Sequence, residues 1–249
     1  MSGELRGRHS GVAAPPRAQD TFVRIRVGGE IIPVRLRRNR RARQLILRVD
    51  SDLEGAVVTL PPRVALKDGI ALATSRGDWI LGQLALLPPR IPFIPGARIP
   101  LFDKDVTLRH RPEARRGVWY EGQSLYVSGS EDHFARRVRD WMRAEARVKI
   151  TARVEAYSER LGRKPSRIVI RDTRSRWGSC AADGTLSFCW RLVMAPPRVL
   201  DYVVAHEVSH LKVPDHSARF WRTVETIFGP FEGPCQWLNE NSGRMHRIG

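Results

Sequence analysis

The chain has 249 residues, 42% of them hydrophobic, and a formal net charge of +17 at pH 7. This length and hydrophobic content suffice for a buried core, formed as one large domain or two small ones. No stretch approaches the ~20 apolar residues that cross a bilayer. Residues 1–20 lack the apolar centre of a signal peptide, and an odd set of three cysteines does not make a disulfide framework. We therefore expect a cytoplasmic protein without a membrane segment.

The positive charge is carried almost entirely by arginine, since five of the 43 basic residues are lysine and 38 are arginine. Such an excess indicates a polyanionic partner such as nucleic acid. Genomic base composition would enrich arginine equally well. The composition leaves both explanations open.

Residues 1–20 are predicted to form a disordered leader. Residues 21–130 are predicted to form a β-rich N-terminal domain. Its first strands are indicated by alternating apolar and polar residues at 22–27, 31–36, 45–49 and 56–60. The basic run at 37–43 either contacts phosphates or forms a solvated hairpin edge that discourages edge pairing, and we favour the solvated edge.

One helix is predicted in this domain, over residues 64–87, because apolar residues recur there at helical spacing before a proline pair. A proline-rich connector follows at 91–100. Short strands separated by glycine-containing turns are then indicated at 106–108, 118–120 and 125–127. The N-terminal domain is thus expected to be β-rich around one helix.

Residues 131–249 are predicted to form a second domain that begins with a long helix. Residues 132–161 contain no Gly or Pro and repeat apolar residues at helical spacing, which is typical of a scaffold helix. A strand at 167–171 and a hairpin that turns at 183–184 follow. The second strand of this hairpin, 186–192, is expected to offer an edge to which an extended peptide adds by main-chain hydrogen bonds.

The sequence HEVSH at 206–210 falls on a predicted helix. His206 and His210, at i and i+4, share one helix face, so both imidazoles can reach one ion. Glu207 lies where its carboxylate touches a water on that ion without being a ligand, as the general base of zinc hydrolases does. His216, brought back by a turn at Pro214, adds a third nitrogen and leaves a fourth position for water. That is the ligand count of a catalytic zinc site.

The strings SRWGSC at 175–180, APP at 195–197, YVV at 202–204 and the histidine segments with FW at 220–221 resemble the YgjP-like metallopeptidase family. This family is related to the SprT-like zinc metallopeptidases. The resemblance implies zinc on His206, His210 and His216 with Glu207 as the base. It also implies an α+β fold with a minimal zincin-like core, made of a long scaffold helix, a small sheet and the HExxH helix, and a β-rich N-terminal part.

We therefore expect a zinc-dependent metallopeptidase that cleaves a protein or peptide substrate by a water activated by Glu207. Arg174 and Arg176 are candidates for contacting the substrate or the oxyanion, and packing or salt bridging around Trp177 is their alternative role. Two other functions stay open. One is a metal-dependent phosphohydrolase acting on nucleotides. The other is a basic nucleic-acid-associated protein with a structural zinc.

Overall fold

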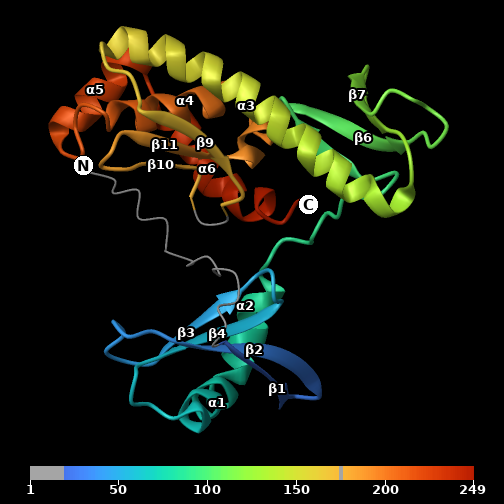
Figure 1. The fold of residues 1–249 in the computed structure, drawn as a ribbon. Coiled ribbons are helices and arrows are strands. Elements are labelled where there is room, and N and C mark those ends of the chain that lie inside the picture. Colours follow the sequence, from blue (N-terminus) through green and yellow to red (C-terminus); the bar gives the residue numbers. More distant parts are fainter. Residues whose placement is uncertain (1–19, 174–175) are drawn as a thin grey trace. The chain divides into compact units, whose positions relative to one another are not determined.

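The computed structural model describes residues 20–173 and 176–249, so the expected disordered leader lies outside the described residues except for Asp20. The described chain is an α+β protein with six α-helices and three small sheets. It consists of two compact units, one ending at Pro88 and the other running from Pro89 to Gly249 (Figure 1). Within the described ranges, no helix combines the length and apolar character needed to cross a bilayer.

The first unit is a four-stranded sheet with two helices packed on one face. Its strands are β1 (Thr21–Val27), β2 (Glu30–Arg38), β3 (Ile46–Asp50) and β4 (Gly55–Leu60), in the spatial order β1-β2-β4-β3. The helices are α1 (Leu66–Ser75) and α2 (Gly77–Ala85). Alternate strand residues such as Val34 and Val58 point inward and share a core with Ala73 of α1 and Ile80 of α2. All four strands predicted for this region are confirmed.

The single helix predicted over 64–87 is wrong, because the chain forms two helices that meet at Arg76. Arg76 leaves the helical conformation, with φ −108° and ψ 16°. The next residue, Gly77, lies directly against Val27, where an added Cβ would come within 2.4 Å of a Val27 methyl carbon. Glycine is a poor helix former, and here it lets α2 approach β1 more closely than any side chain would allow.

A buried ion pair lies on the other face of this sheet. Arg35 of β2 donates to Asp50 at the end of β3, with 3.1 Å between Nη2 and Oδ2. The second carboxylate oxygen of Asp50 accepts the backbone N–H groups of Asp52 and Leu53, at 3.0 and 3.2 Å. Both oxygens of this buried carboxylate therefore have hydrogen-bond donors.

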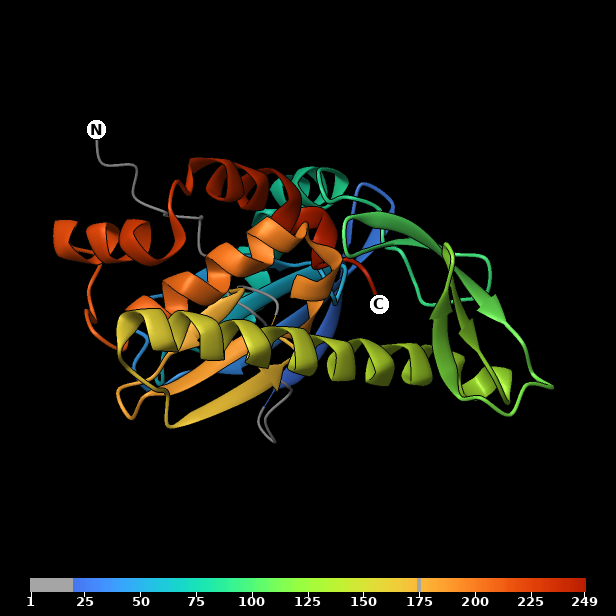
Figure 2. The same ribbon diagram turned by 90° about the horizontal axis from the view of Figure 1, so that it is seen from above.

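The second unit contains two small sheets and four helices. One sheet has β5 (Arg98–Leu101), β6 (Lys104–His110), β7 (Val118–Glu121) and β8 (Ser124–Val127) in the order β5-β6-β8-β7. The other has β9 (Arg167–Arg171), β10 (Gly178–Cys180) and β11 (Thr185–Cys189) in the order β10-β11-β9. The helices are α3 (Phe134–Leu161), α4 (Pro197–Ser209), α5 (Ala218–Phe228) and α6 (Glu232–Met245). Figure 2 shows α3 running from the sheet β5–β8 to the region of α4 and α5.

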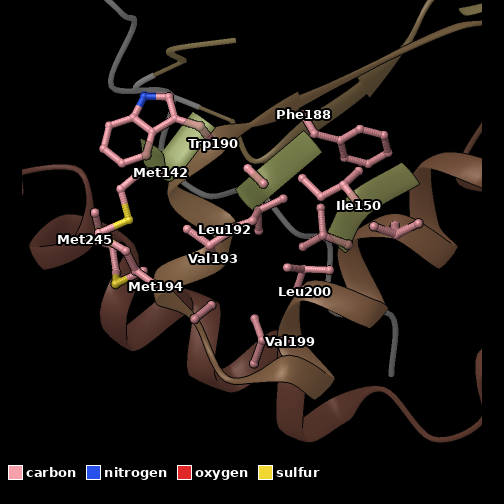
Figure 3. Packing of buried hydrophobic residues seen from close by; sticks show 14 of the residues in the cluster. Met142, Ile150, Phe188, Trp190, Leu192, Val193, Met194, Val199, Leu200 and Met245 are labelled. Carbon is pink, nitrogen blue, oxygen red and sulfur yellow. The ribbon is translucent and has the colours of Figure 1, made fainter. Parts of the chain in front are cut away.

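Helix α3 is the scaffold of this unit. It contributes a stripe of buried residues at helical spacing, namely Val138, Met142, Ala146, Ile150 and Val154. This stripe packs with residues of β11, of the short 3-10 helix η2 (Trp190–Met194) and of α4, several of which are shown in Figure 3. The long helix therefore packs behind the helix that carries the HExxH sequence, as the sequence predicts.

The sheet β5–β8 belongs to this same core, through buried residues such as Ile99, Leu108 and Val127. The compact units consequently divide at Pro88–Pro89, which does not coincide with the domain boundary expected near residue 130. Each strand of this sheet has one apolar face, and α3 packs against that face. Strand periodicity reveals that such a face exists but not which helix covers it.

β11 is the central strand of its sheet. It pairs antiparallel with β10 (Phe188 opposite Gly178) and parallel with β9 (Phe188 opposite Ile170). The prediction that strand 186–192 offers a free edge is therefore wrong, and residues 190–194 form η2 instead of strand. In the described part of the chain, no strand pairs with the other side of β10. The edge strand beside α4 is thus β10.

Candidate metal centre

Helix α4 carries His206, and His210 is the residue that caps its C-terminal end. Its first residue, Pro197, lacks the backbone N–H that the first turn leaves unpaired in any case. Val204 and Val208 lie on the side of the helix that packs into the core, and both are fully buried. His206 and His210, four residues apart, then lie together on the neighbouring side, with ring centroids 5.0 Å apart.

His216 joins them from the segment that precedes α5. This segment is held in a turn in which the Asp215 carboxylate accepts the backbone N–H of Ser217, at 3.1 Å. The His216 Nε2 atom lies 3.2 Å from the Nε2 atom of His206. The candidate ligand atoms of all three histidines lie within 4.8 Å of one another. The structure thus brings together the three residues that the sequence singled out as ligands.

The 3.2 Å between the Nε2 atoms of His206 and His216 is the spacing expected of two zinc ligands. Tetrahedral coordination with Zn–N distances of about 2.0–2.1 Å places two ligand nitrogens about 3.3 Å apart. The Nδ1 atom of His210 lies 3.1 Å from the carbonyl oxygen of Val213. A carbonyl oxygen only accepts, so Nδ1 carries the proton and Nε2 keeps its lone pair. Such a bond to the outer ring nitrogen is the usual way in which a metal-binding histidine is oriented.

The protonation state of the histidines suits metal binding as well. Burial, and then the charges of His210 and His216, lower the pKa of His206 to about 3. Burial likewise lowers the pKa of His210. Both rings are therefore neutral near pH 7, which is the form that binds a metal ion.

Phe220 packs against all three imidazoles. Its ring centroid lies 4.8 Å from that of His206, 4.3 Å from that of His210 and 4.8 Å from that of His216. In the sequence, Phe220 stood out only as part of the family resemblance, without a role at the site. Helical spacing could not reveal this contact, because His216 precedes α5 and only Phe220 lies within it.

Glu207 lies beside this cluster without belonging to it. Its side chain is turned towards β10, where an added Cβ on Gly178 would come within 2.6 Å of Oε1. Glu207 is buried, and the described residues give its carboxylate no hydrogen bond and no ion pair within 4 Å. Burial raises the pKa of Glu207 to about 8, and the charge of Arg176 opposes this rise.

A cavity of about 650 Å³ opens in front of these residues, and the three histidines, Glu207, Gly178 and Lys212 are among those that line it. Strand β10 forms one side. Trp177 accepts from the backbone N–H of Cys189, and Ala181 donates to the carbonyl of Thr185. Because bonded positions alternate along an antiparallel pair, the peptide groups of Gly178 and Cys180 point away from β11. These two residues also line the cavity.

Of the two candidate arginines, only Arg176 lies within the described residues. Arg174 lies outside the described residues. Arg176 is exposed, and its charge opposes the rise that burial causes in the pKa of Glu207. Arg176 is thus near the candidate site. Lys212 is a second cationic residue at the cavity, and it was not among the residues predicted to contact the substrate or the oxyanion.

Comparison with known proteins bears on this site. The family described as "YgjP-like, metallopeptidase domain" matches residues 43–241, most of the chain. Among solved structures, the crystal structure of the metallopeptidase zymogen of Pyrococcus abyssi abylysin is 24% identical, covering 33% of this chain and 82% of that chain, with a TM-score of 0.31. No match is found among curated proteins.

Proposed function

The chain belongs to the YgjP-like metallopeptidase family, and from this premise we propose that it is a zinc-dependent peptidase. The observation that carries the proposal is the convergence of three histidine nitrogens within 4.8 Å beside a buried carboxylate. We propose His206, His210 and His216 as the ligands. Three protein ligands leave a coordination position for water, as in catalytic zinc sites.

When bound, zinc would supply a water of lowered pKa and would polarise the scissile carbonyl group. Glu207 would accept the proton of the attacking water and deliver it to the leaving amine. Its place on the helix suits this role, because it follows His206 directly and lies outside the ligand cluster.

The raised pKa of Glu207 makes the proposed base dependent on the metal. A carboxyl group with its pKa raised to about 8 is mostly protonated at neutral pH, whereas a general base must be ionised. A bound cation beside it would stabilise the ionised form, adding to the attraction from Arg176. The proposed base would therefore be ionised when the metal is bound.

We further propose that a peptide substrate binds along β10. The outward peptide groups of Gly178 and Cys180 can form main-chain hydrogen bonds to an extended chain, which places its scissile bond in the cavity. Arg176, with Arg174 as a second candidate, would contact the substrate or the oxyanion. The proposed substrate edge is therefore β10, whereas the sequence predicted it on strand 186–192.

The test compares the parent protein with a Glu207→Gln variant, both loaded with zinc and incubated separately with casein and with nucleoside triphosphates. We expect cleavage of casein and no hydrolysis of the triphosphates. Glutamine keeps the shape of the side chain but removes the base, so casein cleavage should fall by about 10²–10⁴-fold while zinc content is unchanged.

Elemental analysis of both proteins is the control, because it separates a lost base from a lost metal. Hydrolysis of triphosphates in place of casein would favour the phosphohydrolase. A Glu207→Gln protein with full activity would remove the catalytic role of Glu207, and one without zinc would make Glu207 a ligand.

A further inference from the structure

The position of the Glu207 carboxylate depends on a neighbour that has no side chain. A Cβ built on Gly178 would lie 2.5 Å from Cγ, 2.6 Å from Oε1 and 2.8 Å from Cδ of Glu207. Real Cβ contacts are essentially never shorter than 3.0 Å. The three nearest atoms all belong to Glu207, so a side chain at position 178 would collide first with the proposed base.

Backbone conformation does not explain a glycine at this place. Gly178 is not among the glycines with positive φ, so its backbone is one that other residues adopt without strain. The strand cannot easily retreat either, because Trp177 and Ala181 on either side are hydrogen-bonded to β11 at 2.8 and 2.9 Å. What the position requires is space for the carboxylate.

Other tightly packed glycines lie against the backbone or against core side chains. At Gly55 an added Cβ would lie 2.0 Å from the carbonyl oxygen of Pro33, and at Gly69 it would meet Leu36 and Leu60 at 3.0 and 3.1 Å. Those contacts involve backbone or core side chains, so substitutions there would disturb the fold. At Gly178 the obstacle is the side chain of Glu207 alone, from Cγ to Oε1, so its displacement does not require movement of the backbone or of core residues.

We propose that Gly178 is a positioning residue, whose lack of a side chain sets where the Glu207 carboxylate stands in the cavity. This inference rests on the proposed function, in which Glu207 acts on the attacking water. A displaced carboxylate would still be present and ionisable but would be misaligned with that water. A misplacement of about 1 Å is enough to cost about 10²-fold in rate.

The experiment measures zinc content, kcat and KM for casein cleavage with Gly178→Ala. We expect zinc content to stay at the parent value, because the nearest atoms to the new methyl group are those of Glu207 and not of the histidines. We expect kcat to fall by about 10²-fold with little change in KM. The matched control is Gly233→Ala in α6 of the same unit, where an added Cβ meets nothing within 4 Å, and it should keep the parent kcat.

A double variant distinguishes positioning from general damage. If Gly178 acts through Glu207, adding Gly178→Ala to Glu207→Gln should slow the reaction no further, because the base is already gone. A multiplicative loss in the double variant, loss of zinc from Gly178→Ala, or a parent kcat in Gly178→Ala would each overturn the inference. Failure of the proposed function has another signature, namely a Glu207→Gln protein that is fully active.

Discussion

The two compact units each bury a carboxylate, and the two carboxylates differ in their hydrogen-bond and ion-pair partners. Asp50 in the first unit is 8% exposed, and Glu207 in the second is 7% exposed. Asp50 is paired with Arg35 and accepts two backbone N–H groups. Glu207 has no such partner among the described residues and faces a cavity, where burial raises its pKa to about 8.

The difference shows that burial alone does not reveal the role of an acidic residue. A buried charge that is paired and fully hydrogen-bonded can be part of the folded structure without a role in function. One that is left unpaired at a cavity is costly, and such groups concentrate at functional sites. In the first unit, Asp50 therefore links β3 to β2 through Arg35. In the second unit, we propose that Glu207 takes part in the reaction.

The largest expected effect is the loss of the metal. His206→Ala removes one of three proposed ligands and should abolish stable zinc loading, measured by elemental analysis after dialysis. His133→Ala, at an exposed histidine outside the cluster, is the matched control and should retain about one zinc per chain. Stoichiometric zinc in His206→Ala would show that the ligand assignment is wrong.

Removal of zinc from the parent protein should affect only one of the two units. A ligand present at about 1,000 times its Kd stabilises the state that binds it by about 4 kcal/mol. We therefore expect a chelator to speed amide hydrogen exchange in α4 and α5 while residues 20–88 exchange as before. Equal acceleration in both units would contradict the assignment of the metal to the second unit.

Asp50→Asn should destabilise the first unit by about 3 kcal/mol, because it removes the charge opposite the buried Arg35. Hydrogen exchange of β2 and β3 in increasing urea measures this loss. Glu207→Gln is the matched control at an equally buried carboxylate and should leave stability near that of the parent. If the two variants lost stability equally, the contrast between the two carboxylates would disappear.

The smallest expected effect tests whether stability of the first unit is separate from activity. Gly82 lies exposed on α2, and an added Cβ there meets nothing within 4 Å. Gly82→Ala should stabilise the first unit by about 0.5–1 kcal/mol through helix propensity. Casein cleavage should be unchanged, and a changed kcat would show that the first unit influences the site.

Several features could be predicted from the sequence because they depend on residues close together in the chain. His206 and His210 share a helix face through the 3.6-residue repeat, and the same repeat separates Glu207 from them. The buried stripe of α3 and the strands of the first unit follow equally from local periodicity. His216 could be included because a proline turn returns the chain within six residues of His210.

Other features were decided only by the tertiary structure, because they join residues far apart in the chain. The placement of β10 at the edge and β11 at the centre depends on pairing with β9, and the inclusion of β5–β8 in the second unit depends on packing against α3. The contact between Gly178 and Glu207 arises only when α4 packs on β10. Alternation marks a strand and its apolar face, but which partner covers that face is settled by burial and hydrogen bonding over the whole unit.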